Sequence, residues 1–157
     1  MSVLAELLSR TLQTAGPATA ATTAAVAACG SLDEGNGIAP VNAVSHILWG
    51  DDAAEQDDAS LKYTAPGFAL NAAAIASWAG VYELGFGQRA RRGDVKAAII
   101  GGVATAALAY ITDYYVVPRR LTPGFEKRLS PPSMFAVYAA LAASLPVASL
   151  LAARRKE

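Results

Sequence analysis

Long apolar stretches separated by charged segments make up most of this 157-residue chain. A helix needs roughly 20 mostly apolar residues to cross a hydrocarbon core about 30 Å thick, and each stretch is close to that length. The pattern therefore predicts one all-α domain, residues 1–157, built as an integral membrane bundle of four transmembrane helices. The predicted spans are residues 12–30, 66–86, 97–117 and 133–153.

An alanine-rich soluble four-helix bundle is the alternative to this membrane architecture. Hydrophobic residues make up 54% of the chain and charged residues 17%, against roughly 45–50% and about 25% in soluble domains. A soluble bundle would also show polar stripes with a helical period. Because residues 97–109 contain only Thr105 as a polar side chain, the sequence favours helices that face lipid.

Basic residues lie between the stretches and predict the orientation of the chain. Lys and Arg accumulate on the cytoplasmic side of membrane proteins. With a cytoplasmic N-terminus, the inner side holds Arg10, Arg89, Arg91, Arg92, Lys96, Arg154, Arg155 and Lys156, and the outer side holds the smaller set of Lys62, Arg119, Arg120, Lys127 and Arg128. This predicts a multi-pass protein with both termini in the cytoplasm. The acidic segment 31–65 is then an outer loop, away from the anionic headgroups of the inner leaflet.

The first stretch contains several threonines and a Gly16-Pro17 pair, so we expect it to insert with help from the other helices. Small side chains recur along it every four residues, at Gly16, Ala20, Ala24 and Ala28. Such faces let helices approach closely in lipid. They predict packing into a homo-oligomer or a larger membrane complex.

The lone cysteine, Cys29, ends a Val-Ala-Ala-Cys sequence that resembles the lipobox of bacterial lipoproteins. Against lipidation, the segment before it carries Glu6 beside Arg10 and has no net positive charge, unlike a signal peptide. The sequence leaves two states open, a lipidated Cys29 and a buried unmodified thiol.

Residues 40–52 predict a short amphipathic helix in the first loop. Asn42, Ser45, His46 and Trp49 fall on one side of it and apolar residues on the other. This helix is too short to cross the bilayer, so we expect it to lie in the interface, with Trp49 at headgroup level. His46 is the only histidine, and its possible roles are structural hydrogen bonding, proton transfer, and metal or haem ligation.

Asp113 lies near the outer end of the third span, four residues after Ala109 on a stripe of small residues. An ionisable residue inside a span faces the bundle interior, a cavity or a partner. We expect Arg119, Arg120 or the adjacent tyrosines to be that partner. The candidate outer polar cluster consists of Asn42, His46, Trp49, Asp51, Asp52 and Asp113.

Glu83 is the corresponding acid of the second span, near its opposite end, where the arginines after Gly87 are within reach. Because Glu83 and Asp113 lie at opposite depths, they are not expected to form one catalytic carboxylate pair. The candidate residues for ion pairs or for contacts with anionic headgroups are Glu83, Arg119, Arg120, Lys127 and Arg128.

Three segments carry a resemblance to a known family. They are Ser45-His46-Ile47-Leu48-Trp49-Gly50-Asp51, then Thr64 with Gly67, and then Asp113-Tyr114 followed by the sequence from Pro118 to Glu126. Together they resemble a family of small uncharacterised bacterial inner-membrane proteins over roughly residues 38–155. The resemblance implies a four-span fold in a bacterial inner membrane, and it implies no activity.

Several functional motifs are absent from the sequence. It contains no phosphate-binding glycine loop, no zinc-type Cys and His spacing and no nucleophile elbow. Balanced formal charge gives no support for nucleic-acid binding. The sequence therefore favours a non-enzymatic accessory or assembly subunit without a cofactor. The alternatives are a small transporter or channel for a cation or proton that uses His46, Asp51, Asp52 and Asp113, and a membrane enzyme or redox accessory that uses His46.

Overall fold

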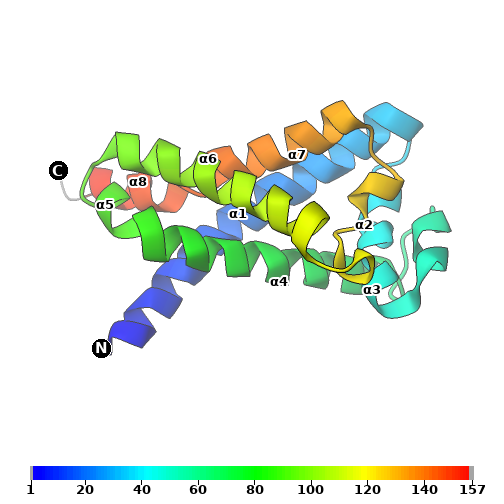
Figure 1. Ribbon diagram of the computed structural model, residues 1–157, viewed down its shortest axis with the longest axis horizontal. Coiled ribbons are helices and arrows are strands. Elements are labelled where there is room, and N and C mark those ends of the chain that lie inside the picture. Colours follow the sequence, from blue (N-terminus) through cyan, green and yellow to red (C-terminus); the bar gives the residue numbers. More distant parts are fainter. Residues whose placement is uncertain (1, 156–157) are drawn as a thin grey trace.

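A computed structural model describes residues 2–155 of the chain, and within this range the backbone forms helices and no strand. The predicted all-α class is confirmed. Four long helices build the molecule (Figure 1): α1 (Val3–Glu34), α4 (Thr64–Tyr82), α6 (Val95–Ile111) and α7 (Pro131–Ser144). Helix α1 packs against α4 and α7, and α6 packs against the same two helices. Each long helix therefore has two neighbours, and their inner faces enclose the core.

Three of the long helices continue beyond these bounds. Helix α4 runs through a π-helical turn, η2 (Glu83–Gly87), into α5 (Gln88–Ala90). Helix α6 runs into a second π-helical turn, η3 (Thr112–Val116). After α7 the chain turns at Pro146, which has no N–H to offer a continuing helix, and α8 (Val147–Arg154) follows.

Two helical segments are long and apolar enough to cross a membrane. They are Val95–Val116, with 22 residues, and Pro131–Arg154, with 24 residues. At a rise of 1.5 Å per residue they measure about 33 and 36 Å, which matches a hydrocarbon core. Helices α1 and α4 do not meet the same criterion, so the structure supports two of the four predicted spans on these grounds.

Small residues bring the helix backbones close together. A Cβ atom on Gly102 of α6 would lie 2.3 Å from the carbonyl oxygen of Ala142 in α7. A cluster of mostly alanine side chains with Ile75, Tyr82 and Leu145 fills the middle of the bundle. A second cluster, which includes Val26, Cys29 and Phe125, joins the helices to the segments that cover one end. The bundle interior thus depends on close backbone approach more than on large side chains.

The segments 35–63 and 117–130, which we call the cap, cover one end of the bundle (Figure 1). The cap contains α2 (Ala39–Val44), α3 (His46–Trp49) and three 3₁₀ turns: η1 (Asp51–Glu55), η4 (Arg119–Leu121) and η5 (Phe125–Lys127). Both segments were predicted as outer loops, and the structure places them together.

The prediction of a single amphipathic helix over residues 40–52 is wrong. The chain forms two short helices there, α2 and α3, and every residue from Ala39 to His46 is buried. The polar side of the segment faces protein because Asn42 finds its partners inside the cap. Its Nδ2 donates to the carbonyl oxygens of Gln56 and Asp58 at 2.8 and 3.0 Å, and its Oδ1 accepts from the Thr64 hydroxyl at 2.6 Å.

Candidate functional site

Ion pairs join the two halves of the cap. Lys127 pairs with Asp51, and Arg128 pairs with Asp57 and with Glu34, the latter at 3.2 Å. The ammonium group of Lys127 lowers the pKa of Asp51. Lys127 and Arg128 were candidates for ion pairs or headgroup contacts, and both form ion pairs with acids of residues 31–65.

The other basic residues of this loop do not reach Asp113. Arg120 donates from Nε to the carbonyl oxygen of Ile47 at 3.1 Å, and both Arg119 and Arg120 are exposed. Neither forms a salt bridge with Asp113 in the part of the chain that the structure describes. Asp113 is instead hydrogen-bonded by Tyr138 of α7, which was not among the expected partners because it is distant in sequence.

His46 is 2% exposed and packs against the second half of the cap. Its Nδ1 lies 2.9 Å from the carbonyl oxygen of Ala43, so Nδ1 carries the proton because a carbonyl only accepts. Gly124 makes this packing possible, since a Cβ there would lie 2.8 Å from Nδ1. The other ring nitrogen, Nε2, is buried without a hydrogen-bond partner. Within residues 2–155, no group of three or more His, Cys, Asp or Glu side chains is arranged to hold a metal ion.

The remaining candidates of the outer cluster lie at the surface of the cap. Trp49 is half exposed, and its indole N–H donates to the carbonyl oxygen of Lys62 at 2.8 Å. Asp52 is exposed. The six predicted residues therefore lie at the same end of the molecule. Only Asp113 lines a cavity beneath the cap, and the other five do not.

Glu83 lies in the π-helical turn η2, at the end of the bundle opposite the cap, and its side chain is completely buried. Arg91 donates from Nη2 to Oε1 at 3.0 Å and from Nε to Oε2 at 3.4 Å. The hydroxyl of Thr14 in α1 donates to Oε1 at 2.5 Å. Gly87 leaves the space for this carboxylate, because a Cβ there would lie 2.1 Å from Oε2. The charge of Glu83 is thus balanced and its hydrogen bonds are made within the chain.

Asp113 lies in the other π-helical turn, η3, beside a cavity of about 90 Å³ directly beneath the cap. The hydroxyl of Tyr138 donates to Asp113 Oδ2 at 2.7 Å. Thr22 of α1 and Asn71 of α4 also line this cavity. Sequence reasoning did not select Thr22, Asn71 or Tyr138 as site residues. The available signal was that each is a polar residue within an otherwise apolar stretch.

A much larger groove, of about 1270 Å³, runs between α6 and the α7–α8 segment. Alanines such as Ala106, Ala139 and Ala142 form its floor, and Tyr110 and Tyr114 lie at its cap end. The rings of Tyr110, Tyr114 and Tyr138 pack together, with centroids 5.1 to 6.2 Å apart. The groove lies between the two segments that are apolar enough to span a membrane.

Comparisons with protein-family models, curated proteins and solved structures find no match to this chain. The predicted resemblance to small bacterial inner-membrane proteins therefore stays a prediction. Function has to be inferred from the chemistry of the two acid sites, the cap and the helix surfaces.

Proposed function

We propose that this chain is a non-enzymatic, multi-pass membrane protein that acts as an assembly subunit and binds a second copy of itself through α1. In this proposal all four long helices cross a bacterial inner membrane, with both termini in the cytoplasm and the cap outside. The proposal keeps the orientation expected from the distribution of Lys and Arg. It also accounts for the charged cap at one end and the arginines at the other.

The observation that supports self-assembly is the direction of the small-residue face of α1. Gly16, Ala20, Ala24 and Ala28 are all exposed on the outside of the bundle. The corresponding stripe of α6 is used inside the molecule, where Gly101, Thr105 and Ala109 are buried. A face of small residues allows close helix packing in lipid, and on α1 this face has no partner within the described chain.

Large apolar side chains on the outer surface support the membrane setting. The chain exposes many of them along its long helices, as expected of a surface that meets acyl chains. Among these residues are Leu4, Leu8, Leu12, Phe68, Val81, Ile99, Ile100, Val103, Leu108, Phe135 and Leu151. The first turns of α1 diverge from the other helices (Figure 1). Leu4, Leu8 and Leu12 are exposed there, and their four-residue spacing puts them on one side of the helix.

The test is to enlarge the exposed face of α1. Ala20→Leu together with Ala24→Leu should shift the protein from oligomer to monomer and weaken self-association at least about tenfold, because the bulkier side chains hold the helices apart. Light scattering in mild detergent and energy transfer between labelled copies in liposomes measure this. Ala104→Leu, at an exposed alanine of α6, is the matched control and should leave association unchanged.

Two results would contradict the proposal. One is a wild-type protein that stays monomeric in both detergent and liposomes. The other is an oligomer that the double variant forms as readily as the wild type. If the wild type instead formed a stable complex with a different membrane protein, and the double variant lost it, then that protein and not a second copy would be the partner of α1.

A further inference from the structure

The small cavity beneath the cap collects one polar side chain from each of the four long helical segments. Thr22 comes from α1, Asn71 from α4, Asp113 from the continuation of α6, and Tyr138 from α7. Apolar residues of the helices and of the cap form the rest of the lining. Polar groups from four helices converge on a space of about 90 Å³ within an otherwise apolar bundle.

The hydroxyl of Thr22 is a buried polar group at this cavity. Thr22 is 4% exposed, and its Oγ1 has no hydrogen-bond partner within residues 2–155. A threonine within a helix can donate to the carbonyl four residues earlier, but this hydroxyl does not. A buried hydroxyl without a partner is costly, and the lone pairs of this oxygen suit an occupant of the cavity that oxygen atoms can coordinate.

Asn71 offers a second neutral oxygen. Its Nδ2 donates to the hydroxyl of Thr23 at 3.4 Å, so the amide nitrogen is oriented toward α1. The amide oxygen remains as an acceptor beside the cavity. Neutral amide and hydroxyl oxygens are ligands that hard cations use in proteins.

Asp113 supplies the charge. The titratable groups around it are Tyr138, Tyr114 and Glu126, none of which is basic. No salt bridge to Asp113 exists in the described part of the chain. A carboxylate that stays ionised inside an apolar bundle needs a counter-charge, and no basic side chain within residues 2–155 pairs with Asp113.

We propose that this cavity binds one small monovalent cation of the Na⁺ class, with the Asp113 carboxylate as the charged ligand and Thr22 and Asn71 as neutral ligands. One carboxylate balances one positive charge, whereas a divalent ion would leave an excess charge in an apolar surrounding. The volume admits an ion with a few waters, since one water takes up about 30 Å³ in the liquid. This site is separate from the proposed assembly face of α1.

The site has a built-in reporter, because Trp78 lines the cavity and the chain has only one other tryptophan, Trp49. In a Trp49→Phe background, Trp78 emission is followed while NaCl replaces choline chloride at constant ionic strength. Melting temperature is measured in the same series. We expect a saturable change in emission and a rise in melting temperature of several degrees, with the same midpoint.

Two variants test the ligands, and a third is the control. Asp113→Asn should weaken Na⁺ binding more than about 100-fold, and Thr22→Val should weaken it about five- to twentyfold. Glu55→Gln, at an exposed acid of the cap, is the control and should bind Na⁺ like the parent.

Several outcomes would overturn the proposal. They are an equal response to Na⁺ and choline, a response to pH alone, and a Na⁺ response that survives in Asp113→Asn. If Asp113→Asn does not fold, then a Thr22→Val variant with unchanged Na⁺ affinity overturns it instead.

Discussion

Glu83 and Asp113 are the same kind of residue in the same kind of place, yet their surroundings differ. Each lies in a π-helical turn that continues a long helix, one at each end of the bundle. Glu83 is hydrogen-bonded by Arg91 and Thr14, and its carboxylate lies tightly against Gly87. Asp113 has a tyrosine and a cavity. Glu83, whose charge is balanced within the chain, stabilises the fold. Asp113, whose charge is not balanced in this way, is available to bind a ligand.

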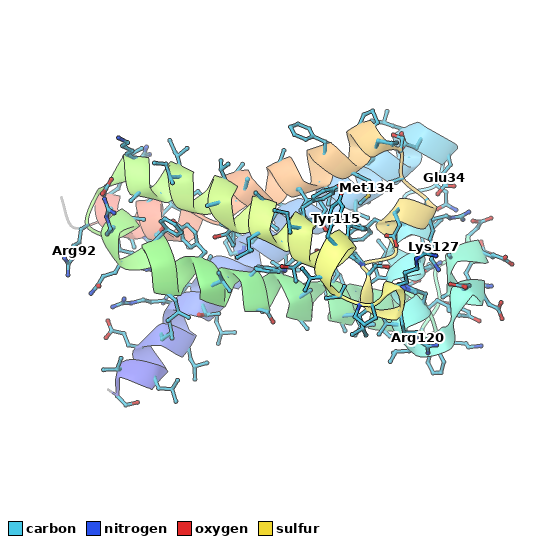
Figure 2. The ribbon with its side chains drawn as sticks, in the orientation of Figure 1. Glu34, Arg92, Tyr115, Arg120, Lys127 and Met134 are labelled. Atoms are coloured by element: carbon cyan, nitrogen blue, oxygen red, sulfur yellow. The ribbon has the colours of Figure 1, made fainter. Side chains whose placement is uncertain are left out.

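The largest effect is expected from removing the cation that pairs with Glu83. Arg91→Met leaves a buried carboxylate without its counter-charge and should lower the free energy of unfolding by about 3–5 kcal/mol. Denaturant unfolding in detergent measures this. Arg92→Met is the control. Arg92 lies at the same end of the bundle, but its side chain is exposed and points away from the helices (Figure 2). This variant should change the free energy of unfolding by less than about 0.5 kcal/mol. If both variants lost the same free energy of unfolding, then the ion pair between Arg91 and Glu83 would not be the cause.

A smaller effect is expected from filling the space that Glu83 occupies. Gly87→Ala places a Cβ 2.1 Å from Glu83 Oε2, so the carboxylate must move away from Arg91, at a cost of about 1–3 kcal/mol. Gly85→Ala lies in the same π turn, and its Cβ meets nothing within 4 Å. It should be neutral or raise stability by up to about 1 kcal/mol. Melting curves of the two variants measure this difference. If Gly85→Ala were the less stable variant, then the tight packing of Glu83 against Gly87 would be contradicted.

The next effect is smaller still and concerns Asp113. In choline chloride without Na⁺, Asp113→Asn removes an unbalanced charge and keeps an acceptor for the Tyr138 hydroxyl. The free energy of unfolding should therefore stay within about 1 kcal/mol of the parent. Denaturant unfolding in the same detergent gives the comparison with Arg91→Met. A loss as large as that of Arg91→Met would mean that Asp113 also stabilises the fold.

Acid pH should act first on surface acids, outside both sites. The pKa values of Asp33, Asp51 and Asp94 are lowered, chiefly by the backbone N–H of Ser130, by Lys127 and by the backbone N–H of Ala97, respectively. A lowered folded-state pKa stabilises the protein above the unfolded-state value, and this contribution is lost as pH falls through the folded-state pKa.

Melting temperature should therefore fall as the pH drops below about 4. Asp94 accepts from Ala97 N at 2.8 Å as the N-cap of α6. Asp94→Asn keeps a good N-cap acceptor without a titrating group, so the variant should melt with less acid sensitivity. An unchanged pH profile in this variant would contradict the contribution of Asp94.

The long helices were predictable because their signal is local. The apolar stretch 66–86 falls within helical segments, 97–117 ends one residue after η3, and 133–153 covers most of α7 and α8 with the turn at Pro146 between them. Helix α1 runs well past the predicted 12–30 span at both ends, since its flanking polar residues also favour a helix. The number of membrane spans is harder to predict. Helices α1 and α4 contain more weakly polar residues and are not apolar enough to be identified as spans by hydropathy.

The sites were predictable only in part. Glu83 and Asp113 stand out because an ionisable residue in an apolar stretch is rare. Thr22, Asn71 and Tyr138 give a weaker signal, and their convergence depends on how each helix is rotated about its axis. The burial of Asn42 and His46 depends on the second half of the cap, which lies far away in the sequence. A helical pattern that looked amphipathic in isolation was therefore misread.

The ion pairs of the cap also constrain the order in which the protein can be made. Asp51 and Asp57 emerge from the ribosome long before Lys127 and Arg128, from which they are separated by 76 and 71 residues. The first half of the cap must wait unpaired until two further helices have been synthesised. Tyr138 follows Lys127 and Arg128 in the chain, so the cavity that Thr22 and Asn71 line cannot be complete before the cap ion pairs can form.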